Sequence, residues 1–518
     1  MKILLAYSKR HFDPAVRSAD NGLRFSSAAI LAAGLYEILS RFGEVDYVDG
    51  LEPPRSLPRR HYDLLVSILG GISPLHRLAC FDKTVLFAVN MHPAERNRIL
   101  HEFNVRYRVC GQALLDRTCV FLKTLDDIKA ADAVFMVGNG EVLRSYVRRG
   151  VPRSRLRCFN YASALEPVKK TQASPGAPVF VYAATEMCLR KGFDIMSRLM
   201  EQAARAGENF RLLVIGAAGA GQYRRKLESL QVLLGPRMAY GGWVDSSSRE
   251  YAALLDEGDF ILFPSLEEGQ AGSVLDAMAR GLVPIVTRAA GIDWSPFGFL
   301  RPELDSPDNL RIIFRALHAA PEERLRLSRA AGRVYADLHL GWREPLARAF
   351  GYLLNHGFPW PRVIADVRDD AFASDYPALA AEGLPADYIL RGGAVLPGSA
   401  DLYDFVSFME KNPRCGVAGA GARLSCKELY WREGEPVPVP RLVRASGEET
   451  GEAWVLGHCA GEEILSALAA DALPPEPPLA VPRGFRRFVA EPAARIGSLF
   501  APSRRMRRKL YNYWRESR

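Results

Sequence analysis

The stretch PSLEEGQAGSVLDAMARG, residues 264–281, places two carboxylates, Glu268 and Asp276, eight positions apart. The apolar run DFILFPS before it predicts a buried strand, and the run from Gly272 predicts a short helix that ends at Gly281. The loop between them therefore presents backbone N–H groups at the N-terminus of a helix. Such a terminus attracts anions, and phosphate is the natural one.

The composition of this loop indicates which ligand it would bind. Gly269, Ala271 and Gly272 are small enough to let a ligand approach the backbone closely. An acid beside a phosphate would repel it, so Glu268 and Asp276 must bind another part of the ligand. Carboxylates accept hydrogen bonds from adjacent hydroxyls. A nucleotide-sugar supplies hydroxyls, then a diphosphate, then hydroxyls again.

Two simpler interpretations of the same acids remain open. Ser273 and Asp276 form S-x-x-D, a capping-box variant that would only satisfy helix N–H groups. Glu268 could equally be a solvated acid of an exposed loop. Under these interpretations the loop carries no ligand.

The residues around this loop predict an α/β protein with several domains. Short apolar strands alternate with helical stretches through residues 1–170, and the alternation restarts after TQASPGAP (171–178) and continues to 357. This rhythm is typical of parallel sheets covered by helices on both faces. We therefore expect two tandem Rossmann-like, doubly wound domains, then a smaller α/β domain over 358–473 and a Pro-rich linker with a basic tail over 474–518.

Composition and charge narrow the class of protein. The 518 residues are 48% hydrophobic and 25% charged, with no apolar run long enough to span a bilayer, and the eight cysteines lack metal-site spacing. These features predict a cytoplasmic protein with reduced thiols. Residues 481–518 carry 11 Lys or Arg and 2 Asp or Glu, so the whole formal excess of +9 lies there. Such a distribution argues against a nucleic-acid-binding body and for a local contact with an anionic partner.

Four segments resemble the retaining group 1 (family four) glycosyltransferases of the GT-B fold. Residues 264–287 are similar to their E-x7-E signature, and RLLVIGAAGAG to their GxGP segment. ADAVFMVGNGEVLRSYVRRGVPRSRLRCFNYAS resembles the last strand, helix and strand of their first domain, and GFLRPELDSPDNLRIIFRAL resembles their closing helices. The resemblance covers some 350 residues and implies a nucleotide-diphosphate-sugar donor.

The resemblance also assigns roles at the donor site. Glu268 would bind the donor sugar, and Asp276, where the family usually has Glu, the ribose. The family neutralises the diphosphate with an Arg and a Lys five positions apart. Lys191 matches the Lys, but Glu186 stands at the Arg position, so adjacent Arg190 is the candidate substitute.

The resemblance implies further contacts on both sides of the donor. Gly22 matches the glycine-rich turn of the first domain, and His92 a histidine near the reacting sugar. An ordinary turn and a structural histidine are the alternatives. Gln270 completes the expected donor-binding set with Gly269, Ala271 and Gly272. The expected catalytic residues are Glu268, His92 and Lys191.

The implied chemistry needs neither a cofactor nor a metal. Relatives of this kind retain the anomeric configuration, and basic side chains and helix N–H groups stabilise the leaving phosphate in place of a cation. Accordingly, we expect no metal site.

The two C-terminal segments suggest accessory roles. Residues 386–419 faintly resemble a GT-A fold whose metal-binding aspartates are replaced by Arg391, Gly392 and Gly393, which implies a degenerate domain; an unrelated domain is the alternative. In the tail, a helix would align Met506, Leu510, Tyr513 and Trp514 on one stripe flanked by cations. A membrane surface, the protein's own surface and RNA are the candidate partners, of which we favour the membrane.

The sequence thus predicts a peripheral membrane glycosyltransferase at the inner face of the cell membrane. Its acceptor would be a lipid-linked glycan of surface polysaccharide, such as lipopolysaccharide or exopolysaccharide. A protein or small-molecule acceptor is one alternative. A non-catalytic sugar-nucleotide-binding scaffold is another.

Overall fold

The computed structural model describes residues 1–7, 27–50, 54–68, 71–111, 115, 124–152, 155–172, 176–219 and 221–356, with six short strands between 363 and 455. All of these residues belong to one compact unit, Met1–Leu468.

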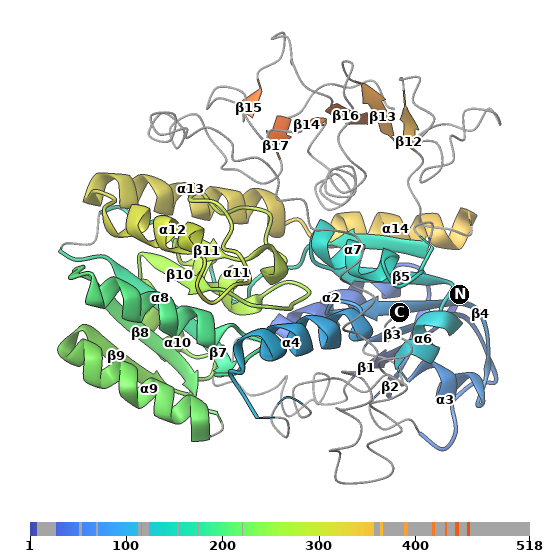
Figure 1. Cartoon of the computed structure of the whole chain (residues 1–518). Coiled ribbons are helices and arrows are strands. Elements are labelled where there is room, and N and C mark those ends of the chain that lie inside the picture. The colour runs from blue at the N-terminus through green and yellow to red at the C-terminus, as the bar shows by residue number, and fades with distance from the viewer. Residues whose placement is uncertain are drawn as a thin grey trace, which may run out of the picture. The chain divides into compact units, whose positions relative to one another are not determined.

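The first domain is built on a parallel sheet with the strand order β2-β1-β3-β4-β5-β6 (Figure 1). Its central strands are apolar runs that are buried on both faces, as expected when helices cover both sides. The strands are β1 (Lys2–Tyr7), β2 (Glu44–Asp49), β3 (His61–Ile68), β4 (Cys80–Ala88), β5 (Ala133–Val137) and β6 (Leu156–Phe159). The helices are α2 (Ser27–Ser40), α3 (Ile72–His76), α4 (Pro93–Tyr107), α6 (Thr124–Ala130) and α7 (Gly140–Val147).

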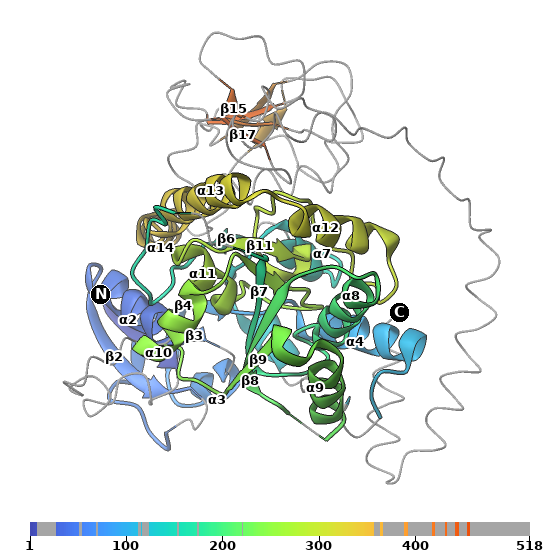
Figure 2. The ribbon, with the colours of Figure 1, turned by 90° about the vertical axis from the view of Figure 1, so that its left-hand side faces the viewer.

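The second domain repeats this architecture around a parallel sheet in the order β11-β10-β7-β8-β9. In Figure 2 its strands lie between α8 and α9 on one side and α10 and α11 on the other. The strands are β7 (Val179–Glu186), β8 (Arg211–Ala217), β9 (Met238–Gly242), β10 (Phe260–Phe263) and β11 (Val283–Val286). The helices are α8 (Phe193–Arg205), α9 (Gly221–Leu234), η3 (Gly235–Arg237), α10 (Arg249–Asp256), α11 (Gly272–Ala279), η4 (Arg288–Ala290), α12 (Pro307–Leu317), α13 (Pro321–His339) and α14 (Arg343–His356).

The two sheets confirm the predicted pair of Rossmann-like domains, and α14, the last helix among the described residues, joins them. Helix α14 packs against α2, and the ring of Phe350 lies 4.9 Å from that of Phe135 on β5. Gly34 makes room for Trp342, because a Cβ at Gly34 would come within 2.4 Å of the indole. The chain thus returns to the first domain after the second is complete, which the sequence did not predict.

A third sheet follows in the order β12-β13-β16-β14-β17-β15, with parallel and antiparallel neighbours. Its strands are β12 (Val363–Ala365), β13 (Tyr388–Arg391), β14 (Val417–Gly419), β15 (Tyr430–Trp431), β16 (Arg441–Arg444) and β17 (Ala453–Val455). Arg391 ends β13, whereas Gly392 and Gly393 lie outside the described residues. The likeness to a degenerate GT-A domain stays a prediction.

Candidate functional site

The predicted anion-binding loop connects β10 to α11. Strand β10 ends at Phe263, α11 begins at Gly272, and Gly281 ends the helix with φ of 79°. The N-cap residue of α11 is Ala271, and no side chain caps the helix. The capping-box interpretation of Ser273 and Asp276 is therefore wrong.

The turn that contains Arg190 and Lys191 packs directly on this loop. The carbonyl of Arg190 accepts hydrogen bonds from the Leu266 N–H and from Ser265 Oγ, both at 2.9 Å. Gly192 has φ of 69°, and a Cβ there would lie only 1.8 Å from the Pro264 carbonyl oxygen. Backbone contacts and a glycine thus hold the basic turn against the acidic loop, although about 75 residues separate them in sequence.

Glu268 lies between the two cations of that turn. Its Oε1 is 2.9 Å from Arg190 Nη1 and 2.5 Å from Lys191 Nζ, and its side chain is 8% exposed. Burial alone would raise the pKa of the Glu268 carboxyl, but Arg190 and Lys191 outweigh burial and lower it. Glu268 is therefore not a solvated loop acid. A buried carboxylate thus lies in contact with two cations in the loop that precedes α11.

The two cations respond differently to this environment. Burial lowers the pKa of Lys191 despite its contact with Glu268. The pKa of Arg190 is raised, because Glu268 and Glu267 outweigh the opposing effect of burial. Arg190 hence remains charged beside Glu268, and its role in place of the family's arginine stays a prediction.

Glu267, which the sequence did not single out, is fully buried beside Glu268. Its Oε1 accepts a hydrogen bond of 3.1 Å from the Met91 N–H, and its Oε2 forms an ion pair of 3.3 Å with Arg96 Nε. Both partners belong to the first domain. Burial raises the pKa of Glu267, whereas that of Glu268 is lowered, because the nearest cations lie closer to Glu268. The doublet of glutamates was the only signal of this role in the sequence.

Asp276 is buried on α11 and hydrogen-bonded to protein groups. Ser163 Oγ donates to its Oδ1 at 2.6 Å, and Tyr251 supplies a second side-chain hydrogen bond. Burial raises the pKa of Asp276 to about 7, against the opposing effect of those two hydrogen bonds. A ribose hydroxyl that binds Asp276 would have to replace the hydroxyl of Ser163 or Tyr251 as its hydrogen-bond donor.

Asp276→Asn tests this environment through the pH dependence of stability. A carboxyl whose pKa is raised in the folded state from 3.8 to about 7 stabilises the fold fully below pH 3.8 and loses that contribution as the pH rises to 7. We expect the melting temperature of Asp276→Asn minus that of the wild type to increase between pH 5 and pH 8. Thermal melts of both proteins across that range measure it. A constant difference would contradict the raised pKa.

His92 is buried at the N-terminus of α4, directly after Met91. Its Nδ1 accepts a hydrogen bond from the Ala94 backbone N–H. The backbone N–H of His92 donates to Ser145 Oγ at 2.9 Å. Burial lowers the pKa of His92 to about 4, with a further contribution from Arg149. The imidazole is therefore neutral near pH 7, and it also caps a helix, as the structural alternative suggested.

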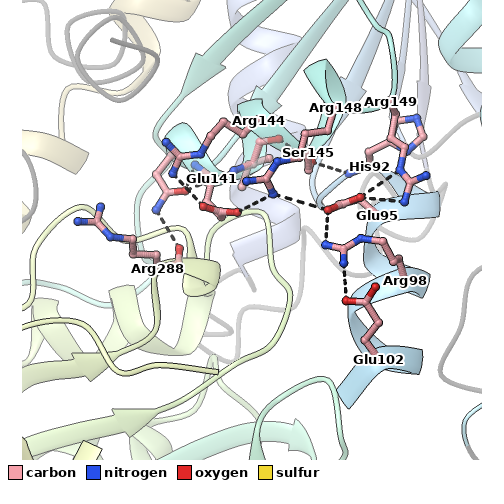
Figure 3. A network of polar contacts seen from close by, with 12 residues as sticks. His92, Glu95, Arg98, Glu102, Glu141, Arg144, Ser145, Arg148, Arg149 and Arg288 are labelled. Carbon is pink, nitrogen blue, oxygen red and sulfur yellow. Dashed lines mark hydrogen bonds and ion pairs between the residues drawn. The ribbon is translucent and has the colours of Figure 1, made fainter. Parts of the chain in front are cut away.

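A network of charged residues surrounds His92 (Figure 3). Glu95, 3% exposed, pairs with Arg98 at 2.6 Å and Arg149 at 2.9 Å. Arg148 reaches both Glu95 and Glu141 more loosely, at 3.6 and 3.5 Å. These contacts tie the first turn of α4 to the end of α7, so they fix the backbone that carries His92.

Two other predicted donor-binding residues, Gly269 and Gln270, lie at the junction between the domains. The Gln270 side chain binds Asn160 and the Tyr161 N–H at 2.9 and 3.0 Å. A Cβ at Gly269 would lie 2.2 Å from the carbonyl oxygen of Val89, which follows β4. Ala271 is the helix cap described above, and Gly272 begins the helix. Gly22 lies outside the described residues.

One cluster in the described part of the chain has donor atoms close enough to share a metal ion. His61, Asp63 and Asp82 lie near the amino ends of β3 and β4. The predicted donor loop meets the first domain at the opposite ends of these strands. None of the described helices combines the length and the apolar character needed to cross a bilayer.

Comparison with known proteins bears on the loop directly. Residues 177–311 match the family model described as glycosyl transferases group 1, and this match contains Arg190, Lys191, Glu268 and Asp276. This part of the chain is a group 1 glycosyltransferase domain. The family predicted from the E-x7-E signature is confirmed. No curated protein matches the sequence significantly.

Several solved structures resemble this chain at low identity. A variant of TarM from S. aureus, solved with fondaparinux, α-GlcNAc-glycerol and UDP, is 13% identical with a TM-score of 0.42, and covers 56% of this chain. This chain spans 55% of TarM. Sucrose-phosphate synthase from Thermosynechococcus elongatus is 20% identical with a TM-score of 0.46, covering 68% of this chain and 98% of its own. WaaG, a glycosyltransferase involved in lipopolysaccharide biosynthesis, is 14% identical with a TM-score of 0.39. The match covers 69% of this chain and 100% of WaaG.

Proposed function

We propose that this protein is a retaining, metal-independent glycosyltransferase that uses a nucleotide-diphosphate-sugar donor. The observation that carries the proposal is the placement of Glu268 between Arg190 and Lys191 in the loop that precedes α11, within the group 1 domain. Two cations and helix N–H groups suit a diphosphate. A carboxylate beside them suits the hydroxyls of a sugar.

The roles of the residues follow from this arrangement. Arg190 and Lys191 would bind the diphosphate and stabilise the charge that develops on it as the sugar–phosphate bond breaks. The acceptor hydroxyl would form its bond to the anomeric carbon on the same face, and its proton would pass to the departing phosphate. Glu268 would orient the sugar and act as neither nucleophile nor base. His92, neutral near pH 7, would donate a hydrogen bond to the sugar.

We propose further that the acceptor is a lipid-linked glycan of surface polysaccharide, at the inner face of the cell membrane. The excess of +9 in residues 481–518 and the stripe of Met506, Leu510, Tyr513 and Trp514 support this choice. These residues lie outside the described part of the structure. Removing 481–518 should abolish binding to anionic vesicles and activity on lipid-linked acceptors, while release of nucleotide from the donor persists. Activity on lipid-linked acceptors that survives removal would contradict the role of the tail. A full-length protein that shows no activity on lipid-linked acceptors would favour a protein or small-molecule acceptor.

The direct test of the reaction is release of nucleotide from UDP-, GDP-, ADP- and CMP-sugars, with and without EDTA. One donor should be hydrolysed slowly without an acceptor, at a rate that EDTA leaves unchanged. Loss of activity with EDTA would overturn metal independence. If a donor binds but none is ever turned over, the scaffold alternative replaces the enzyme.

A further inference from the structure

Glu267 connects the donor loop to the first domain by contacts that its neighbour Glu268 does not make. Its Oε1 accepts the Met91 N–H at 3.1 Å, and its Oε2 lies 3.3 Å from Arg96 Nε. On the side of the second domain, Arg190 Nη1 lies 3.8 Å from the same Oε2. Arg190 thus stands between the two glutamates, 2.9 Å from Glu268.

A carboxylate in this position is stable only while the two domains remain in contact. Glu267 has no exposed surface, and a buried charge without partners is costly. Its nearest cation and its backbone donor both belong to the first domain. Separation of the domains would remove Met91 and Arg96 together and leave Arg190 shared with Glu268. The charge of Glu267 therefore favours the arrangement in which the donor loop faces the His92 turn.

We propose that Glu267 is a positioning residue that fixes the donor loop to the turn before α4. It would thereby hold Glu268 and His92 in a fixed position relative to each other. Met91, which donates to Glu267, directly precedes His92, and Glu267 directly precedes Glu268. One hydrogen bond therefore joins the backbones on which both expected sugar-contacting residues stand. This role rests on the proposed function.

This role also explains how donor binding would affect the contact with the first domain. A diphosphate would draw Arg190 and Lys191 toward its own oxygens. Glu267 would then depend on Met91 and Arg96 alone. Its links to the first domain become more important when the donor is bound, so donor and domain contact should favour each other.

The test compares Glu267→Ala and Glu267→Gln with a matched control, Asp259→Ala. Asp259 is also a buried carboxylate that accepts one backbone N–H, from Val179 at 2.9 Å, and approaches one arginine, Arg324 at 3.8 Å. Both partners lie in the second domain, Val179 on β7 and Arg324 on α13. Asp259→Ala should thus lower stability without changing the contact between the domains.

In the wild type, the Met91 amide should be protected from hydrogen exchange, and Glu267→Ala should remove that protection. We expect kcat for donor hydrolysis to fall about tenfold in Glu267→Ala, within the usual range of coupling between sites, while the donor Kd changes less. Glu267→Gln keeps an acceptor for Met91 and should recover part of both effects. Asp259→Ala should alter neither Met91 exchange nor the ratio of kcat to Kd.

Two results would overturn this proposal. One is unchanged Met91 exchange in Glu267→Ala, and the other is an equal loss of kcat in Glu267→Ala and Asp259→Ala. Failure of the proposed function looks different, because the wild type would then bind no donor or turn none over. Even in that case, the exchange of Met91 would report whether Glu267 joins the two domains.

Discussion

Glu268→Ala is expected to lower donor turnover about 100-fold while the affinity for the free nucleoside diphosphate stays the same or increases. In the structure Glu268 neutralises Arg190 and Lys191, the two cations that a diphosphate would bind. Without Glu268 the diphosphate meets both cations without a competing carboxylate. The sugar, however, loses the group that orients it, and loss of one positioning contact can lower the rate about 100-fold.

Calorimetry with the nucleoside diphosphate and an assay of nucleotide release separate these two effects. Glu201→Ala is the matched control, since Glu201 lies on the surface of α8 and pairs with Arg205 at 2.6 Å. It should change neither quantity. A joint loss of diphosphate affinity and turnover in Glu268→Ala would mean that Glu268 only maintains the loop.

Arg190→Met with Lys191→Met is expected to lower the affinity for the nucleoside diphosphate about 100-fold, because hydrogen bonds to charged groups contribute about 1.5–3 kcal/mol each. The two side chains reach Glu268 from one turn, so both lie within reach of the same anion. Arg190→Lys should recover only part of the affinity, since lysine keeps the charge but cannot bind phosphate through two parallel hydrogen bonds. Titration calorimetry at fixed ionic strength measures each variant.

Arg198→Met serves as the control for the loss of positive charge. Arg198 lies on α8 in the same domain and pairs on the surface with Asp305 at 3.0 Å. Its loss should change the affinity little. Should the double variant bind the diphosphate like the wild type, Arg190 and Lys191 would be structural partners of Glu268 and nothing more.

Local sequence patterns predicted the frame of the site well. Apolar runs gave the strands β10 and β11, and Gly281 marked the end of α11, because these features depend on residues close in the chain. The role of Arg190 in place of the family arginine stays a prediction. Arg190 neighbours Lys191, and both reach Glu268 in the structure.

The partners of the acids were not predictable, because they come from distant segments. Ser163 lies 113 residues before Asp276, and Met91 lies 176 residues before Glu267. No periodicity or spacing records which of two adjacent glutamates will face the other domain. The burial of Asp276, which raises its pKa to about 7, likewise depends on residues that the fold brings to α11 from distant segments.

The loop around Glu268 is expected to bind a nucleotide-diphosphate-sugar, and calorimetric titration of the full-length wild type with UDP-, GDP-, ADP- and CMP-sugars, all in the presence of EDTA, measures this binding. One of the UDP-, GDP- and ADP-sugars should bind at a single site per chain, whereas the CMP-sugar, which carries only one phosphate, should not. If none of the three diphosphate donors binds, Glu268, Arg190 and Lys191 form a structural ion cluster, and the donor site assigned to this loop does not exist.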